Sequence, residues 1–168
     1  MRMSKKCILF LLSVITLTSC ESNEEADFVK KVSIKEVLPV TQIESNNITE
    51  EQFVDLYSQT TVINSREKLT DTFNRLGISN CDEMNNIDYE EKTLLVRFFF
   101  SFKSLPVTSV AHFLYYHPKE NYYDYHLRFE STEFKETDNI VLYYTGIVID
   151  KIEDSNIKSS FGNTIGKN

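Results

Sequence analysis

The sequence contains no tryptophan and only four glycines, none of which is clustered with another. A loop that cradles a phosphate group needs several glycines close together, so the chain lacks the usual nucleotide-binding loop. The Gly-x-Ser-x-Gly elbow that presents a nucleophilic serine is missing as well. A stacking platform for sugars would more often include tryptophan. These absences predict a protein without a bound cofactor and without a recognisable catalytic motif.

Cysteine is also scarce, with one residue at each of positions 7, 20 and 81. Two of the three lie within the first twenty residues, so Cys81 is the single cysteine of the rest of the chain and no disulfide can form within that part. An exported domain of this kind is held together by its hydrophobic core alone. The carboxylates of Asp82 and Glu83 oppose formation of a reactive thiolate, which favours a buried thiol over a nucleophile.

The first nineteen residues carry no acidic side chain, and Arg2, Lys5 and Lys6 precede an apolar run at residues 7–17. A helix of these eleven residues rises roughly 16 Å. About 20 apolar residues are needed to span a membrane. A basic head followed by a short apolar stretch is instead typical of an export signal. We predict that residues 1–19 are a lipoprotein signal peptide.

The end of the apolar run reads Leu17-Thr-Ser-Cys20 and resembles the lipobox of bacterial lipoproteins. In that family the cysteine thiol receives a diacylglyceryl group and the peptide bond before it is cleaved. Each buried methylene stabilises membrane binding by about 0.8 kcal/mol, and one acyl chain alone binds only marginally. Two or three chains on Cys20 would make a lasting anchor. The resemblance implies a cell-envelope protein held to the outer membrane, on its periplasmic side or at the cell surface.

Basic side chains become few once the leader is removed. The remaining 149 residues carry fifteen basic and twenty-five acidic side chains, a net charge of −10. This balance excludes a nucleic-acid partner and a polybasic mode of membrane binding. Residues 20–30 begin with four acids in seven positions and predict a flexible acidic tether. Acidic residues after the lipidated cysteine also resemble the surface-export signal of Bacteroidetes lipoproteins. Residues 31–168 are long enough for a single domain.

The clearest helix lies at residues 65–77. Ser65 can cap it, Glu67 lies in its first turn, and Gly77 can end it. Its apolar residues recur at helical spacing on one face and are Leu69, Phe73 and Leu76. A short strand is predicted just before it, at residues 60–63. The other N-terminal predictions are a first edge strand at 32–37, a loop at 44–50 and a helical turn or two at 50–58.

From residue 93 onward the sequence is typical of β structure. Residues 93–102 are apolar on both faces, as in a central strand. Residues 123–129 alternate between apolar and polar side chains, which predicts a strand with one wet face. The other predictions are a strand at 107–116, a hairpin loop at 117–121, a strand at 140–152 with a bulge or bend at Thr145-Gly146, and a short last strand at 157–161. The pattern predicts an α+β fold, a mostly antiparallel β-sheet of four to six strands with one main helix, about 65–77, packed on it.

Four segments between Thr61 and Asp154 resemble a family of small Bacteroidetes lipoproteins of unknown function, which are similar in turn to the C-terminal domain of the protease-complex accessory protein PrcB. The segments are Thr61–Leu69, Ile87–Val96, Tyr125–Phe129 and Thr145–Ile152. The chain departs from that family after the long strand, where Ser101-Phe-Lys-Ser-Leu-Pro106 replaces a glycine-rich turn. The resemblance supports the fold and raises an accessory or inhibitory role beside an exported protease, although a shared fold does not fix an activity.

Several polar groups are candidates for chemistry. The three histidines are His112, His117 and His126, all in the β half. His126 shares a strand face with Asp124, but two ligands two residues apart do not bind a metal without a third, so no metal site is predicted and a solvated polar face is the alternative. The acid pairs Asp88/Glu90 and Glu133/Glu136 could serve a glycan hydrolase if their carboxyl groups lay at hydrolytic separation, which the sequence does not reveal.

Aromatic residues are concentrated in the β half, where fourteen of the twenty-one lie between Phe98 and Tyr144. One interpretation is that both sheet faces are covered, one by the helix and one by the N-terminal segment. The other is a tyrosine-rich recognition surface, formed by Tyr122, Tyr125 and Tyr143. We predict a non-enzymatic envelope lipoprotein that binds a protein partner. The alternatives are a glycan-acting hydrolase, an accessory subunit or inhibitor of an exported protease, and a purely structural or regulatory lipoprotein.

Overall fold

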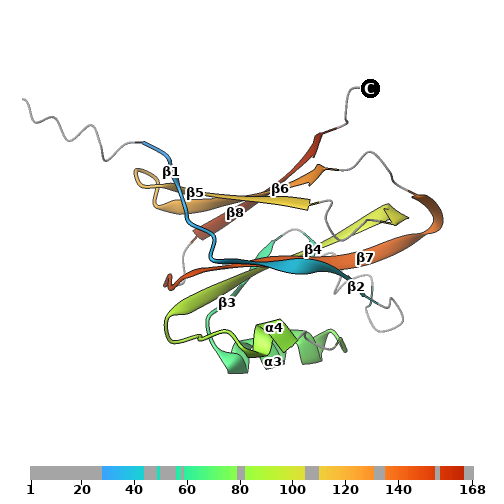
Figure 1. Ribbon diagram of the computed structural model, residues 1–168, viewed down its shortest axis with the longest axis horizontal. Helices are drawn as coiled ribbons and strands as arrows, with labels where there is room; N and C mark the ends of the chain where they lie inside the picture. Colours follow the sequence, from blue (N-terminus) through green and yellow to red (C-terminus); the bar gives the residue numbers. More distant parts are fainter. Residues whose placement is uncertain are drawn as a thin grey trace, which may run out of the picture.

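The computed structural model describes residues 28–43, 49, 56–57, 59–78, 82–104, 110–130, 135–153 and 156–164. The predicted signal peptide, Cys20, the tether as far as residue 27, and Cys81 lie outside these residues. The described residues form two four-stranded sheets and two helices in three layers (Figure 1). One sheet, called sheet B below, lies between the other, called sheet A, and the helices.

Sheet A has the strand order β1-β5-β6-β8, and sheet B has the order β2-β7-β4-β3. The strands of sheet A are β1 (Lys30–Lys31), β5 (Val110–His117), β6 (Tyr122–Glu130) and β8 (Asn156–Thr164). Those of sheet B are β2 (Glu36–Ile43), β7 (Lys135–Asp150), β4 (Lys92–Ser104) and β3 (Thr60–Ile63). All paired strands run antiparallel except β6 and β8, which are parallel.

The prediction of a β-rich, mostly antiparallel domain with one main helix is confirmed, but the prediction of a single sheet of four to six strands is wrong. The eight strands divide between two sheets that pack face to face. The described part of the N-terminal segment, from residue 28 onward, extends the sheet edges rather than covering a sheet face. It adds β1 to the edge of sheet A and β2 to the edge of sheet B. The second face of sheet B is covered by sheet A.

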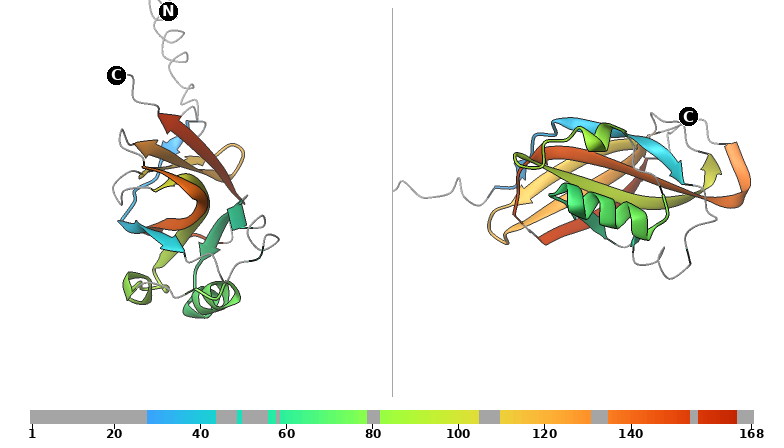
Figure 2. Two further views of the ribbon diagram at one scale, coloured as in Figure 1. Left: turned by 90° about the vertical axis from the view of Figure 1, so that its right-hand side faces the viewer. Right: turned by 90° about the horizontal axis from the view of Figure 1, so that it is seen from below.

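The predicted helix is present as α3 (Arg66–Arg75), which lies across sheet B in Figure 2. Ser65 caps its N-terminus, because the Lys68 backbone N–H donates to Ser65 Oγ at 3.1 Å. Its C-terminus ends at Gly77, which has a φ of 61°. There the backbone N–H of Gly77 donates to Asn74 O and that of Ile78 donates to Phe73 O, the pairing of a Schellman motif. The short helix α4 (Asp82–Asn85) lies on the same side of sheet B.

Strand β4 is central, as predicted, and residues 93–99 are all buried. Its side chains point alternately into two cores. One core fills the space between sheet B and the helices, and the part of it that β4 and α3 contribute is Leu94, Val96, Phe98, Leu69 and Phe73. The second core lies between the two sheets and includes Leu95, Phe99, Leu114, Tyr125, Leu127, Tyr143 and Ile147. Aromatic residues therefore fill two cores rather than one sheet face.

The bulge predicted at Thr145-Gly146 is present between β7 and β2, with its extra residue on β2. Leu38 pairs with Gly146 and Thr41 with Tyr144, so two residues of β2 lie opposite Thr145, whereas β7 pairs with β4 in unbroken register through Gly146. Gly146 is required for a different reason. A Cβ at this position would lie 2.7 Å from the backbone oxygen of Leu95 and 3.2 Å from Cδ1 of Leu94. The glycine thus permits a close approach of neighbouring strands.

The remaining strand predictions are confirmed with shifted bounds. The short strand at 60–63 is β3, and the hairpin loop at 117–121 joins β5 to β6, with Asn121 at a φ of 50°. The strand predicted at 107–116 is β5 at 110–117, and the last strand extends to 156–164. The first strand is displaced, since 32–35 are not in a strand and β2 begins at 36. Residues 44–50 lie outside the described part apart from Thr49, and within 50–58 only Leu56 and Tyr57 are described as helical.

Candidate functional site

The tyrosines of the predicted recognition surface do not lie together. Tyr125 is fully buried and Tyr143 is 3% exposed, both in the core between the sheets, where the ring of Tyr143 stacks on Phe99 with 5.5 Å between centroids. Tyr122 is partly exposed on the opposite face of sheet A. Successive strand residues point to opposite faces, so Tyr122 and Tyr125, three positions apart on β6, cannot share one. The surface predicted from these three residues is therefore not formed.

Tyr125 belongs to a chain of hydrogen bonds that joins the two sheets. Thr145 Oγ1 donates to Leu38 O at 3.0 Å and lies 3.3 Å from Nε2 of His112, while Nδ1 of His112 lies 2.8 Å from the Tyr125 hydroxyl. Because the Thr145 proton is already used, Nε2 of His112 is the donor to Thr145 and Nδ1 accepts from Tyr125. Burial lowers the pKa of His112 to about 4 and raises the pKa of Tyr125, which keeps both groups neutral. This series of hydrogen bonds has a structural role, because the side chains of Tyr125 and Thr145 are buried from solvent.

The outer face of sheet A carries the opposite set of side chains. We define the aromatic–cationic face as Lys31, Phe113, Tyr115, His117, Tyr122, Asp124, His126, Arg128, Lys158 and Ser160, which share this face by their strand register. All of these are partly or fully exposed. The helices lie on the far side of sheet B, so no described element covers this face (Figure 1).

Rings and cations on this face are paired across strands. The guanidinium of Arg128 lies 4.9 Å from the ring centroid of Phe113, and the ammonium of Lys158 lies 3.7 Å from that of Tyr122. The ring of His117 stacks on Tyr122 at 4.3 Å with 8° between planes. Such contacts hold the stems of the cationic side chains against the rings of the sheet.

The charge of the face is opposite to that of the chain. The basic residues of the face are Lys31, Arg128 and Lys158, and Asp124 is the carboxylate among its described side chains; the register also places Glu130 at the end of this face. The whole sequence has a net charge of −7. A positive, aromatic surface on an acidic domain is therefore a local arrangement that the composition does not predict.

Asp124, His126 and Ser160 have the residue types of a hydrolase triad but not its connectivity. Ser160 Oγ donates to Asp124 Oδ1 at 3.5 Å and lies 2.8 Å from Nδ1 of His126. Both contacts are made by the serine, so the imidazole is not placed between the acid and the serine and is not oriented by the carboxylate as in a triad. Nucleophilic activation of Ser160 does not follow from this geometry. In the described part of the chain, no group of three or more His, Cys, Asp and Glu residues is close enough to hold a metal ion.

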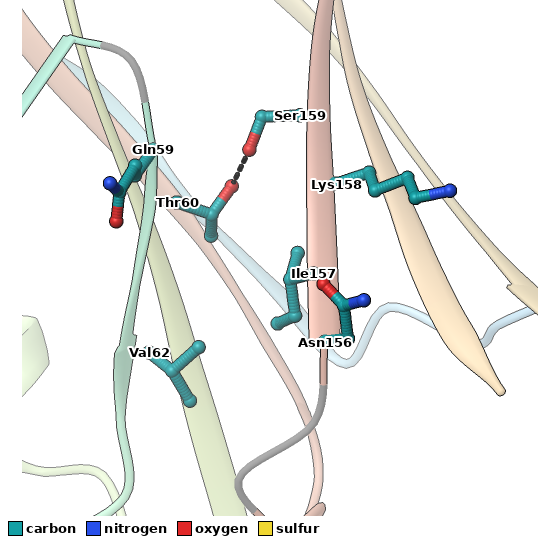
Figure 3. Close-up of a pocket in the computed structure, with 7 residues that line it drawn as sticks. All are labelled: Gln59, Thr60, Val62, Asn156, Ile157, Lys158 and Ser159. Carbon is teal, nitrogen blue, oxygen red and sulfur yellow. Dashed lines mark hydrogen bonds between the residues drawn. The ribbon is translucent and has the colours of Figure 1, made fainter.

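The other candidate residues lie apart. Asp88 and Glu90 are exposed in the turn before β4, where the Glu90 backbone N–H donates to Asp88 Oδ1 at 3.1 Å. Glu133 and the side chain of Glu136 lie outside the described residues. A groove of about 570 Å³ lies between β3 and β8 (Figure 3). Its described lining is Gln59, Thr60, Val62, Asn156, Ile157, Lys158 and Ser159, which includes no carboxylate.

Arg97 is a polar residue that sequence reasoning left aside. It is 1% exposed and points between the sheets, with its guanidinium carbon 4.1 Å from the ring centroid of Phe161. The sequence does indicate that Arg97 is buried, because it shares one face of a central strand with the apolar residues Leu95 and Phe99. Burial lowers the pKa of Arg97 to about 10, so it is still protonated at neutral pH.

A scan against protein-family models, a search of curated proteins and a search of solved structures each found no match. Within the described residues, no helix has the length and apolar character needed to cross a membrane.

Proposed function

We propose that the chain is a lipid-anchored protein of the bacterial cell envelope that binds an acidic segment of a partner protein on the aromatic–cationic face. The anchor is the lipid on Cys20, which holds the domain at the outer membrane through the acidic tether. The observation that carries the proposal is the excess of cations and aromatic rings on the uncovered outer face of sheet A.

Charge complementarity selects the class of partner. Carboxylates of an acidic segment can pair with Arg128 and Lys158, which the rings of Phe113 and Tyr122 hold in place. Aromatic side chains and arginine are also the residues that contribute most to binding at protein interfaces. The face is too mixed in composition for a nucleic-acid surface, and the net negative charge of the chain opposes one.

The other functions predicted from the sequence have less support. A glycan hydrolase needs two facing carboxylates in a cleft, and the groove between β3 and β8 has none in its described lining. A role as accessory subunit or inhibitor of an exported protease remains compatible with the proposal, since such a protease would be one kind of partner.

Site-specific photo-crosslinking in intact cells tests the proposal. A photoreactive phenylalanine analogue replaces Tyr115 in the centre of the aromatic–cationic face, or Thr70 on the exposed side of α3 as the control. We expect the Tyr115 position to give crosslinks to an acidic protein segment, identified by mass spectrometry, and the Thr70 position to give none to that segment. Crosslinks from Tyr115 only to lipid or glycan, or the same products from both positions, would overturn it.

A charge reversal provides the matched test of mechanism. Arg128→Glu and Arg66→Glu change the net charge equally, but Arg128 is on the aromatic–cationic face and Arg66 is on α3. We expect the Tyr115 crosslink to fall at least tenfold in the Arg128→Glu protein and to be unchanged in the Arg66→Glu protein. Equal loss in both would indicate a long-range charge effect rather than recognition by this face.

A further inference from the structure

The side chain of Arg97 is a buried cation whose hydrogen-bonding capacity is largely unused. It is 1% exposed, and neither its Nε nor its Nη1 has a hydrogen-bond partner. These two nitrogens carry three N–H bonds. Buried guanidinium groups are normally paired with carboxylates, and an unpaired one is strongly unfavourable. No ion pair joins Arg97 to a carboxylate of the described residues.

The surroundings of Arg97 favour a cation but do not neutralise it. Its guanidinium lies over the ring of Phe161, and the ring of Tyr57 stacks on the same phenylalanine with 5.6 Å between centroids. Tyr57 and Tyr125 both act electrostatically to keep the group charged. An aromatic ring stabilises a guanidinium through its face, but it offers no acceptor for the in-plane N–H groups. These N–H groups therefore remain available to an oxyanion.

The groove between β3 and β8 is lined by strand neighbours of this residue, although Arg97 is not part of the described lining. Thr60 lines the groove and is the cross-strand partner of Arg97, and Ser159 lines it two residues before Phe161 on the same face of β8. Figure 3 shows the Thr60 and Ser159 hydroxyls pointing toward each other, with 2.5 Å between oxygens. In the same view Val62 and Ile157 line the space below them. The groove thus has an apolar patch at Val62 and Ile157 within a mostly polar lining, and it carries hydroxyls at Thr60 and Ser159.

We propose that the groove between β3 and β8 binds a small organic anion, a carboxylate with an apolar body, and that the carboxylate pairs with Arg97. The volume of about 570 Å³ is within the usual range for small-molecule sites. Val62 and Ile157 contact the apolar body. The ligand separates Thr60 from Ser159, and the two hydroxyls then donate to the carboxylate alongside the guanidinium. This site shares Lys158 with the aromatic–cationic face, but Arg97 does not belong to that face, so a test at Arg97 is independent of the proposed protein partner.

Calorimetric titration of the intact protein with octanoate and with the neutral analogue octanamide tests this site. The two probes share an apolar chain and differ in charge. We expect octanoate to bind at least tenfold more tightly than octanamide to the wild-type protein. In an Arg97→Met protein we expect this preference to disappear, whereas Arg66→Met, which removes an exposed cation on α3, should keep it.

Two outcomes would overturn the proposal. One is that octanoate and octanamide bind the wild-type protein equally or not at all at millimolar concentration. The other is that the Arg97→Met protein retains the preference for octanoate. Methionine is apolar and similar in length, so the variant should fold. If it does not, the Nε–H resonance of Arg97 in the wild-type protein decides the question, because pairing with octanoate must shift it and octanamide must not.

Discussion

At the scale of single residues, His112 illustrates how burial assigns a protonation state. Its ring accepts from Tyr125 and donates to Thr145, an arrangement that needs the neutral imidazole. Burial lowers its pKa from 6.5 to about 4. A histidine of this kind makes folding depend on pH in a range where exposed histidines do not.

We predict that acid destabilises the protein through His112. Above pH 6.5 the imidazole is neutral in both the folded and the unfolded chain, so its contribution to stability is complete. As the pH falls below 6.5 the unfolded chain binds the proton first, and stability is lost until about pH 4, where the folded protein binds it as well. The loss is about 2–3 kcal/mol, as a shift of this size implies. Urea denaturation at pH 7 and pH 4.5 measures it.

His112→Gln and His117→Gln are the matched variants, since His117 lies on the partly exposed aromatic–cationic face. We expect His112→Gln to flatten the dependence of the unfolding free energy on pH between 4 and 6.5, and His117→Gln to leave it as in the wild-type protein. An unchanged slope in His112→Gln would assign the acid sensitivity to other groups.

A second prediction at this scale concerns Gly146. A Cβ at this position meets the Leu95 carbonyl oxygen at 2.7 Å, and a backbone atom in a central strand cannot move aside. We expect Gly146→Ala to lower the free energy of unfolding by about 1–3 kcal/mol, as overpacking does in other cores. Chemical denaturation gives the value. A loss below about 0.5 kcal/mol, which is typical of uncrowded surface sites, would contradict the crowding.

At the scale of secondary structure elements, α3 is specified by its own sequence. Ser65, Gly77 and the spacing of three apolar residues act over a few positions along the chain, and the predicted bounds match the observed helix. The helix also packs as its pattern indicates, with Leu69 and Phe73 buried against sheet B. Local signals of this kind are visible in a sequence because the groups that satisfy one another are close along it.

We predict that Ser65→Ala destabilises the protein by about 1 kcal/mol, because it leaves the Lys68 backbone N–H without its acceptor. Thr70→Ala removes a similar hydroxyl from an exposed position of the same helix, where alanine has the higher helix propensity, and should be neutral or stabilising. Thermal unfolding of both variants separates the cap from the general effect of removing a hydroxyl. Equal midpoints would show that the cap contributes nothing.

Which strands pair with one another is harder to predict from the sequence of single strands. Alternation on β6 correctly predicts one apolar and one polar face, and apolar residues on both sides correctly make β4 central. The parallel pairing of β6 with β8 is not visible in either strand, because the partners are more than thirty residues apart and the pairing depends on where the chain returns. A glycine in a strand can mean a bulge or a close contact, and β7 has both, since β2 is bulged opposite Thr145 and Gly146 lies close to Leu95.

At the scale of the whole molecule, the lipid on Cys20 remains a proposal with a direct test. We predict that Cys20→Ser moves the protein from the membrane fraction to the soluble fraction, because the acyl chains that hold it are no longer attached. Cys81→Ser makes the same chemical change elsewhere and should remain with the membrane. Immunoblotting of the membrane and soluble fractions after a carbonate wash measures where each variant is found. Retention of Cys20→Ser in the washed membrane would show that another part of the chain binds there.

The number of sheets is also a property of the whole molecule. The β half contains more aromatic residues than one sheet face can bury. From the sequence we expect the helix to cover one face of the sheet and the N-terminal segment to cover the other. Sheet A does so instead, and it buries Tyr125 and Tyr143 while it leaves Tyr122 on the aromatic–cationic face. This face, and the position of Arg97 next to a strand neighbour that lines the groove, arise from residues of several strands that are distant in the sequence.

The sequence by itself determined the features that depend on neighbours along the chain. These are the helix with its two caps, the alternation of β6, the central position of β4 and the expected export and lipidation signal. Only the tertiary structure decided which strands pair, that the strands form two sheets, which tyrosines are buried, and that Arg97 is enclosed without an acceptor. The physical reason is that burial and strand pairing depend on contacts between segments far apart in the chain, whereas capping and alternation depend on residues within one turn or one strand.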